Sequence, residues 1–262
     1  TMDTRSSREQ LNKLAQEAGK LGIASQQAVI EYVEAADVIN VALDELGEGA
    51  TRDIGKLSSI YGDAERMGLG KAMLAVGAAI NEVSQNSTAS ASYLVDFENR
   101  MAGVGKQADM SIPKIMGYAS VLDQNAQQVE MSATALQGII MKMYQDPGKL
   151  ARIAGINVKE FARLVREDAN EALLQLLDTL GKAGGMQALA PMFDEMKLDG
   201  SRAASVLSVL AGNIESVRRE QKLAQEAFDE GTSAITEFNV QIIRCRRSST
   251  RPKSCLLYTS DA

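Results

Sequence analysis

Residues 131–144 read MSATALQGIIMKMY, and the spacing of their apolar side chains decides the fold class. These side chains belong to Met131, Ala135, Leu136, Ile139, Ile140, Met143 and Tyr144. Recurrence at i, i+4, i+8 and i+12 places them on one face of an α-helix, whereas a half-buried strand would alternate apolar and polar residues. The sequence Asp-Pro-Gly at 146–148 is predicted to end this helix, because proline interrupts helical hydrogen bonding.

Similar helical patterns, separated by short turns rich in glycine or polar residues, cover most of the chain. The further predicted helices span residues 6–20, 26–46, 50–61, 67–83, 91–102, 111–123, 157–164, 168–180, 186–196 and 201–238, the last with a bend near Gly212. No stretch alternates as a half-buried strand does. We therefore predict an all-α fold, an irregular multi-helix bundle of about ten short to medium helices.

Residues at the ends of these patterns predict where helices begin and stop. Asn157 with Glu160, and Asp168 with Glu171, have the spacing of a capping box and are predicted to begin helices. The polar run at 84–88 is predicted to be a loop.

The segment GVGK at 103–106 partly resembles a phosphate-binding loop. That loop requires a glycine five residues before the glycine that precedes the lysine, and a serine or threonine after the lysine. Arg100 and Gln107 occupy these two positions. We therefore interpret the segment as a turn that ends the preceding helix.

The composition favours helices and argues against catalysis. Hydrophobic residues make up 45% of the chain and aromatic residues only 4%, and strong helix formers such as Ala, Leu and Met dominate. Histidine, the commonest general base and metal ligand at neutral pH, is absent, and the two cysteines are Cys245 and Cys255. Two thiols near one end, without a histidine, predict neither a zinc site nor a disulfide framework. We predict no catalytic, cofactor-binding or metal-binding residue.

Two pairs of carboxylates can be compared with a glycosidase site, which needs only two acids in the correct geometry. The pairs are Asp168 with Glu171, and Asp194 with Glu195. Sugar sites also supply aromatic platforms, and this chain has no tryptophan and few other aromatic residues. We interpret both pairs as helix caps or solvated acids, and predict that the chain is not an enzyme.

The charge of the chain is unevenly distributed. The net charge is −6, but residues 242–262 hold five basic residues against one acid, so the preceding 241 residues carry a net charge of −10. An acidic body argues against a nucleic-acid-binding surface, because phosphate binding relies on lysine and arginine. The most apolar run, 68–80, is interrupted by Lys71 and is too short to span a bilayer, so we expect no membrane segment.

The last part of the sequence differs from the rest. Residues 242–262 read IIRCRRSSTRPKSCLLYTSDA, which combines both cysteines with a basic cluster and lacks a helical period. A basic arm is one interpretation. We favour another, because CLLYTSDA at 255–262 resembles a translated adapter of sequencing libraries. We therefore divide the chain into a helical region at 1–241 and a non-native read-through tail at 242–262, and expect a fragment whose natural sequence continues past Gln241.

Several short stretches in a fixed order resemble one known family. They are AQEAGKLG at 15–22, VEAAD at 33–37, AINEVSQNS at 79–87, GINVKEF at 155–161, DANEA at 168–172 and MFDEM at 192–196. Together they resemble the core region of phage tail tape-measure proteins, over most of residues 11–241. Each motif is weak alone, and their order along the chain carries the resemblance.

This resemblance implies a structural protein of the phage or prophage virion. Tape-measure proteins are long helical chains with coiled-coil stretches, which lie in the tail lumen, set tail length during assembly in the host cytoplasm, and leave when DNA is ejected. The implied partners are the tail tube protein, tail assembly chaperones, baseplate or tail tip proteins and further copies of the chain, with no small-molecule substrate. The family supplies no catalytic residue, cofactor or metal ligand for these positions.

Two other hypotheses stay open. A generic helical scaffold or adaptor protein of bacterial or prophage origin would share the same composition and helical patterns. A tail-borne, lysozyme-like hydrolase is the third hypothesis, and the residue types present favour it least.

Overall fold

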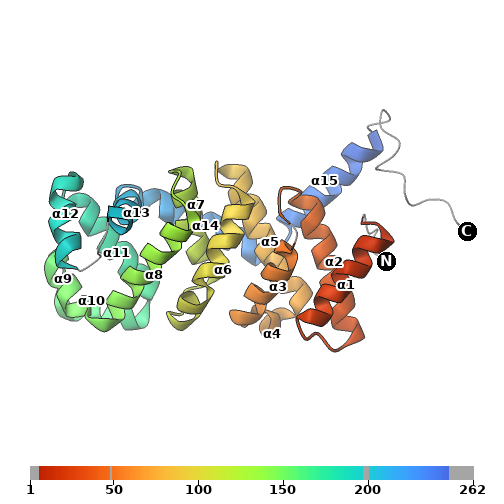
Figure 1. Cartoon of the computed structure of the whole chain (residues 1–262), viewed down its shortest axis with the longest axis horizontal. Helices are drawn as coiled ribbons and strands as arrows, with labels where there is room; N and C mark the ends of the chain where they lie inside the picture. The colour runs from red at the N-terminus through yellow and green to blue at the C-terminus, as the bar shows by residue number, and fades with distance from the viewer. Residues whose placement is uncertain (1–5, 48, 197–200, 248–262) are drawn as a thin grey trace, which may run out of the picture. The chain divides into compact units, whose positions relative to one another are not determined.

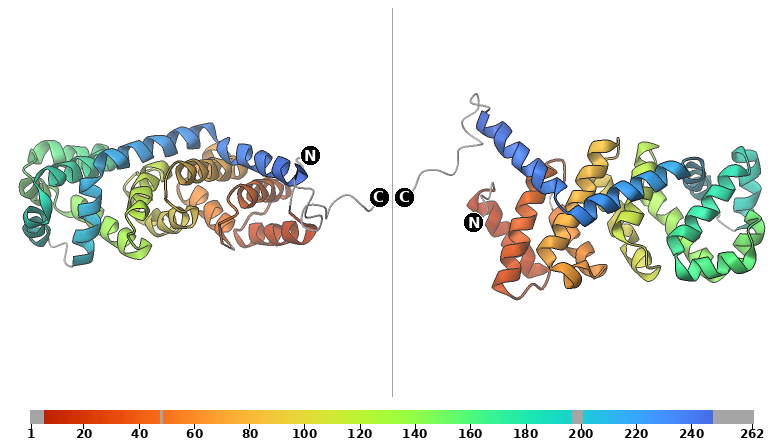
Figure 2. Two further views of the ribbon diagram at one scale, coloured as in Figure 1. Left: turned by 90° about the horizontal axis from the view of Figure 1, so that it is seen from above. Right: turned by 180° about the vertical axis from the view of Figure 1, so that it is seen from behind.

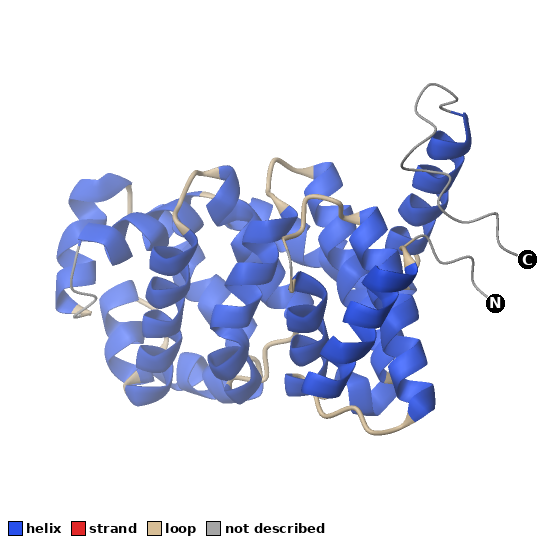
Figure 3. Cartoon of the chain, turned by 45° about the vertical axis from the view of Figure 1, so that its right-hand side comes forward, coloured by secondary structure: helices blue, strands red, loops and turns tan. Residues whose placement is uncertain are grey.

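The computed structural model describes residues 6–47, 49–196 and 201–247, and in these residues the backbone forms fifteen helices and no strand (Figures 1 and 3). The helices are α1 (Arg8–Lys20), α2 (Gln26–Ala42), α3 (Ala50–Ile60), α4 (Asp63–Met67), α5 (Leu69–Asn86), α6 (Ala91–Gln107), α7 (Ile112–Gln124), α8 (Val129–Gln145), α9 (Pro147–Ala154), α10 (Val158–Glu167), α11 (Ala169–Lys182), α12 (Gly185–Glu195), α13 (Ser201–Gly212), α14 (Ile214–Glu230) and α15 (Ser233–Arg247). The predicted all-α class is confirmed, with more helices than the ten or so expected.

The chain divides into two compact units, and the division falls within α5 and α14. Unit 1 comprises the described residues of 1–82 and 226–262. Here α2 packs against α1, α3 and α15 (Figure 2). The largest fully buried side chains of this unit are Tyr32, Ile39, Ile54, Leu57, Met73 and Ile80. This apolar core supplies the main free energy that holds the helices of unit 1 together.

Unit 2 comprises the described residues of 83–225 and contains α6 to α13, with most of α14. In it α6 packs on α7 and α8, α9 packs on α10, and α13 packs on α8 and α11. Its largest fully buried side chains include Leu94, Phe97, Met101, Tyr118 and Phe161. Unit 2 also contains the functional candidates described below.

Of two predicted interruptions, the loop at 84–88 begins later than expected, with residues 87–88 outside the helix, and the turn at 103–106 is wrong because a helix runs through it. Helix α5 continues to Asn86, across most of the loop expected at 84–88, and α6 continues to Gln107, across the turn expected at 103–106. Just after the end of α6, Asp109 takes the left-handed conformation with φ 53°. There the N–H of Met110 donates to the carbonyl of Gly105 over 2.9 Å. Tertiary packing of α6 on α7 and α8 therefore outweighs the low helix propensity of its glycines.

The Asp-Pro-Gly sequence at 146–148 ends one helix and also begins another. It terminates α8 as predicted, but the carboxylate of Asp146 accepts a hydrogen bond from the N–H of Lys149 over 2.8 Å, and Pro147 opens α9. A proline in the first turn of a helix needs no hydrogen-bond partner for a backbone N–H. The same Asp146-Pro147 pair can therefore end α8 and begin α9. Helix α9 and the short helix α4 are therefore additions to the helices expected from the sequence.

The long helix predicted over 201–238 is three helices. It breaks at Asn213 and again at Gly231, where φ is 64°. Helix α15 then runs to Arg247, so residues 242–247 of the predicted tail are helical, and residues 248–262 lie outside the described residues. The origin of the tail stays a prediction.

Both predicted caps begin helices. The side chain of Asn157 accepts hydrogen bonds from the N–H groups of Lys159 and Glu160, over 3.0 and 3.1 Å, at the start of α10. The carboxylate of Asp168 accepts from the N–H of Glu171 over 3.0 Å at the start of α11. Each cap satisfies helix N–H groups that have no partner within the helix.

Candidate functional site

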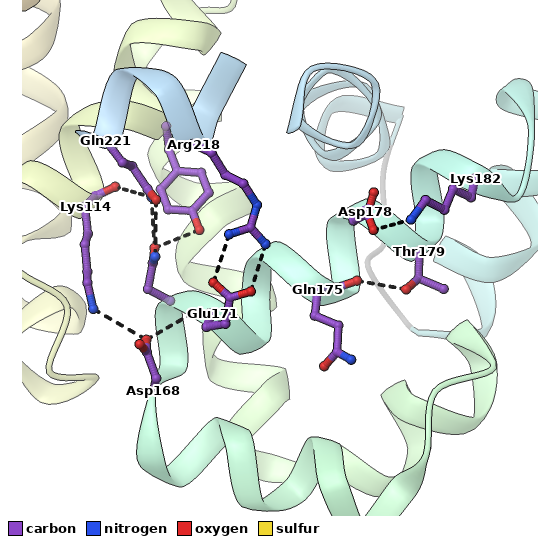
Figure 4. Close-up of polar contacts among 11 residues, drawn as sticks. Lys114, Asp168, Glu171, Gln175, Asp178, Thr179, Lys182, Arg218 and Gln221 are labelled. Atoms are coloured by element: carbon purple, nitrogen blue, oxygen red, sulfur yellow. Dashed lines mark hydrogen bonds and ion pairs between the residues drawn. The ribbon is translucent and has the colours of Figure 1, made fainter. Parts of the chain in front are cut away.

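A buried cluster of polar side chains joins α7, α11 and α14 in unit 2, and we call it the polar junction; it consists of Tyr118, Asn170, Gln221 and the carbonyl of Lys114 (Figure 4). The amides of Asn170 and Gln221 bond reciprocally, over 3.2 and 2.9 Å. Gln221 also donates to the carbonyl of Lys114 over 2.7 Å, and the hydroxyl of Tyr118 donates to Asn170 Oδ1 over 2.9 Å. One side chain from each helix thus takes part in a single network.

Burial makes these hydrogen bonds important for the stability of unit 2. Tyr118 is fully buried, and Asn170 and Gln221 are 5% and 9% exposed. Burial also raises the pKa of Tyr118, so that its hydroxyl stays a neutral donor. A buried polar group costs free energy unless it is paired, and this network pairs all three side chains. The junction therefore favours one position of α14 along its axis relative to α7 and α11, because a shifted helix would leave these buried groups unpaired.

Gly117 allows α14 to reach the junction. A Cβ at this position would lie 2.8 Å from the backbone nitrogen of Gln221 and 3.0 Å from the carbonyl oxygen of Val217, and would overlap Cγ of Gln221. Real Cβ atoms do not approach backbone so closely. Only glycine allows α7 and α14 to pack at this separation.

Two ion pairs lie at the exposed rim of the junction. The guanidinium of Arg218 donates to both carboxylate oxygens of Glu171, over 3.0 and 2.8 Å, and the ammonium of Lys114 lies 3.5 Å from Asp168. The hydrogen bonds with Glu171 raise the pKa of Arg218. Because all four side chains are partly exposed, each pair contributes at most about 1 kcal/mol. These pairs orient the helices more than they stabilise them.

A second polar contact between α7 and α14 involves a buried acid. The hydroxyl of Ser120 donates to Glu220 over 3.3 Å and accepts from the side-chain amide of Gln124 over 2.9 Å. Glu220 is 3% exposed and also pairs with Arg219 over 3.4 Å. This contact adds to the specificity with which α14 packs on α7.

The residues singled out from the sequence are placed as follows. Asp168 and Glu171 serve as a helix cap and as rim ion pairs of the junction, while Asp194 and Glu195 are exposed in the last turn of α12. Cys255 lies outside the described residues. Within the described ranges, no group of three or more acidic or thiol side chains has the geometry of a metal site.

The polar junction itself was not predicted from the sequence, although a signal for it exists. In α14, Gln221 lies between Val217 and Ala224 on a helical stripe that the structure buries, and Asn170 precedes the leucine stripe of α11. A polar residue inside an apolar stripe indicates a buried polar contact. The identity of the partners still required the tertiary structure, because they lie 51 and 107 residues apart in sequence.

In unit 1, the VEAAD stretch at 33–37 has a comparable structural task. Asp37 is 1% exposed, and its carboxylate accepts a hydrogen bond from the backbone N–H of Ser6 over 3.0 Å. One turn earlier in α2, the hydroxyl of Tyr32 donates to Glu17 over 3.2 Å. Both contacts fasten the first helix and the residues just before it to α2.

None of the described helices combines the length and the apolar character that a membrane-spanning segment requires.

These features define an all-α protein whose described polar side chains cap and align helices. Residues 1–196 match the family described as phage-related minor tail protein, and the chain belongs to this family. It is therefore a phage tail protein with a structural role, located in the virion tail together with other tail components. No curated protein and no solved structure matches the chain.

Proposed function

We propose that the chain is a segment of the tape-measure protein of a phage tail, acting in tail assembly and tail-length determination. Membership of the minor tail protein family is the observation that carries this proposal, since it covers residues 1–196. The ordered motifs of the sequence, from 15–22 to 192–196, add the resemblance to the tape-measure core. In this proposal the chain lies in the tail lumen and leaves it when DNA is ejected.

The proposed partners are the tail tube protein, the tail assembly chaperones, the baseplate or tail tip proteins and further copies of the chain. Large apolar side chains on the surface support a role in protein contacts. Met141 and Tyr144, one turn apart on α8, are both 45% exposed, and Ile30 and Ile60 are similarly exposed in unit 1. Apolar surface of this kind gains free energy when a partner covers it.

The contacts of several acidic side chains support a non-catalytic role. Asp168, Glu171 and Glu220 are all engaged in caps or ion pairs that hold helices together. Asp168 and Glu171 were candidates by residue type, and their contacts account for their positions. We propose no active site in residues 1–241.

Mass spectrometry of phage particles before and after DNA ejection tests the tape-measure proposal. Peptides from residues 1–241 are expected in intact virions and are expected to be depleted from the emptied tails. The tail tube protein of the same particles is the control, because it stays in place after ejection. Retention of the chain in emptied tails would contradict release from the lumen, and its absence from intact particles would favour the scaffold or adaptor alternative.

We also propose that residues 242–262 are not native. The change of composition at this point and the adapter-like stretch at 255–262 support the proposal. Sequencing the parent gene from unamplified phage or host DNA is expected to show that the codons after Gln241 encode a different amino-acid sequence. Recovery of the same 242–262 codons from such DNA would overturn it.

A further inference from the structure

Glu98 is an acid in the core of unit 2 that has no polar partner. Its side chain is fully buried in α6, and neither carboxylate oxygen has a hydrogen-bond partner. One turn away on either side, Leu94 and Met101 are also fully buried. The position is therefore part of an apolar helix face.

The other buried acids among the described residues differ from Glu98. Asp37 accepts a hydrogen bond from the backbone N–H of Ser6, and Glu220 accepts one from Ser120 and pairs with Arg219. Such contacts compensate an ionised carboxylate for the water that it loses on burial. Glu98 has no comparable compensation.

The charged groups of the neighbouring helices do not compensate an ionised Glu98 either. The titratable residues of α7 and α8, the helices that pack on α6, are Lys114, Tyr118, Asp123, Glu130, Lys142 and Tyr144. Lys114 pairs with Asp168 and Glu130 with Arg100, and neither carboxylate oxygen of Glu98 has a hydrogen-bond partner. Burial is the one cause that raises the pKa of Glu98 well above its usual range.

Two polar groups at the start of α6 contact the neighbouring helices. Tyr93 donates to Ser132 of α8 over 2.9 Å, and the backbone N–H of Ser90, which caps α6, donates to Asp123 of α7 over 2.7 Å. Asp96 is exposed. Polar contacts of α6 with its neighbours therefore occur at its start and again at Arg100, which pairs with Glu130 of α8, whereas the carboxyl of Glu98 between them has no partner.

We propose that the packing of α6 against α7 and α8 is a pH-sensitive closure, tight when the buried carboxyl of Glu98 holds its proton and loosened when that proton is lost. An ionised carboxylate without a partner is strongly disfavoured in an apolar core. The chain avoids it either by keeping the proton or by opening α6 to water.

The direction of the pH dependence follows from the proton balance. Below the ordinary pKa of 4.5, Glu98 is protonated in both the closed and the open state, and pH has no effect through this group. Above 4.5 the open state releases the proton while the closed state retains it. The equilibrium then shifts toward opening by up to about tenfold for each unit of rising pH, until the raised pKa of the closed state is reached.

Hydrogen exchange of the full 262-residue chain tests this closure between pH 4.5 and about 8. The protection of residues 91–107, corrected for the intrinsic exchange rate, is compared in the wild type, Glu98→Gln and Asp96→Asn. The ratio of protection in E98Q to that in the wild type is expected to rise with pH, by up to about tenfold per unit. D96N removes a charge from an exposed position of the same helix and is expected to follow the wild type.

A ratio that does not change with pH would overturn the proposal, as would an equal pH dependence in D96N and E98Q. If E98Q does not fold, Glu98→Met takes its place, because it has a similar length without a polar group. Direct ¹³C NMR titration of the wild-type Glu98 carboxyl carbon gives an independent result. A midpoint above 4.5 supports the closure, and a midpoint at the ordinary value overturns it.

Discussion

Replacement of Gly117 by alanine is expected to lower the free energy of unfolding of unit 2 by about 3 kcal/mol, which corresponds to a melting temperature lower by roughly 6–12 °C. The added Cβ would lie 2.8 Å from the backbone nitrogen of Gln221 and 3.0 Å from the carbonyl oxygen of Val217. Backbone atoms cannot rotate away as a side chain can, so α14 would have to move. That movement would also stretch the hydrogen bonds of the polar junction.

Thermal and urea unfolding followed by circular dichroism in the far ultraviolet measures this effect. Gly103→Ala is the matched control, because Gly103 lies in the interior of α6 and a Cβ added there would have nothing within 4 Å. There alanine is expected to stabilise the helix by about 0.5–1 kcal/mol. Equal effects of the same substitution at both positions would show that the close approach of α14 at Gly117 is absent in solution.

Replacement of Asn170 by leucine is the second large effect, with an expected loss of about 3 kcal/mol. Leucine has the same number and branching of side-chain heavy atoms, so the change chiefly removes hydrogen bonds. The hydroxyl of Tyr118 would lose its acceptor, and Oε1 of Gln221 would lose its donor. Each would remain buried without a partner, and each such loss costs about 1–3 kcal/mol.

A double-mutant cycle with Tyr118→Phe identifies the cause of this loss. The Y118F variant has no hydroxyl left to satisfy, so N170L is expected to cost less in the Y118F background than in the wild type. Additive effects within about 0.5 kcal/mol would indicate that the two side chains are not coupled and that the junction does not act as one network. Chemical denaturation at constant pH supplies the four free energies.

The G117A and N170L variants also test whether residues after the family match at 1–196 belong to the fold of unit 2. The family match ends at residue 196, whereas Val217 and Gln221 belong to α14 and complete the core around α7 and α11. Strong effects of G117A and N170L would show that residues after the matched segment are integral to the fold of unit 2. A truncation designed at residue 196 would then remove α13 and α14, including the buried side chains Val217 and Gln221.

Particular elements show how far the sequence alone predicts this fold. The helices that carry clear apolar stripes, such as α8 and α11, were predicted within a few residues, as were the caps Asn157 and Asp168. The errors lie where local propensity and tertiary packing disagree. Glycines suggested a turn at 103–106, but α6 is held in the helical state there by its neighbours.

The candidate site was predicted less completely. The sequence indicated that its acids were structural and that no histidine chemistry was available, and it placed Asp168 and Glu171 at the start of α11. It did not reveal that Glu171 pairs with Arg218, or that Glu98 is buried alone. On α6, Glu98 looks like any other acid of an amphipathic helix.

The sequence by itself determined the all-α class, most helix boundaries and the resemblance to phage tail proteins, because these depend on local spacing and on short motifs along the chain. Only the tertiary structure decided which polar residues are buried and what they contact. The partners of Gln221 lie 51 and 107 residues away in sequence, and no local pattern encodes such a distance. Burial of Glu98 is likewise a property of three packed helices, and not of the helix that carries it.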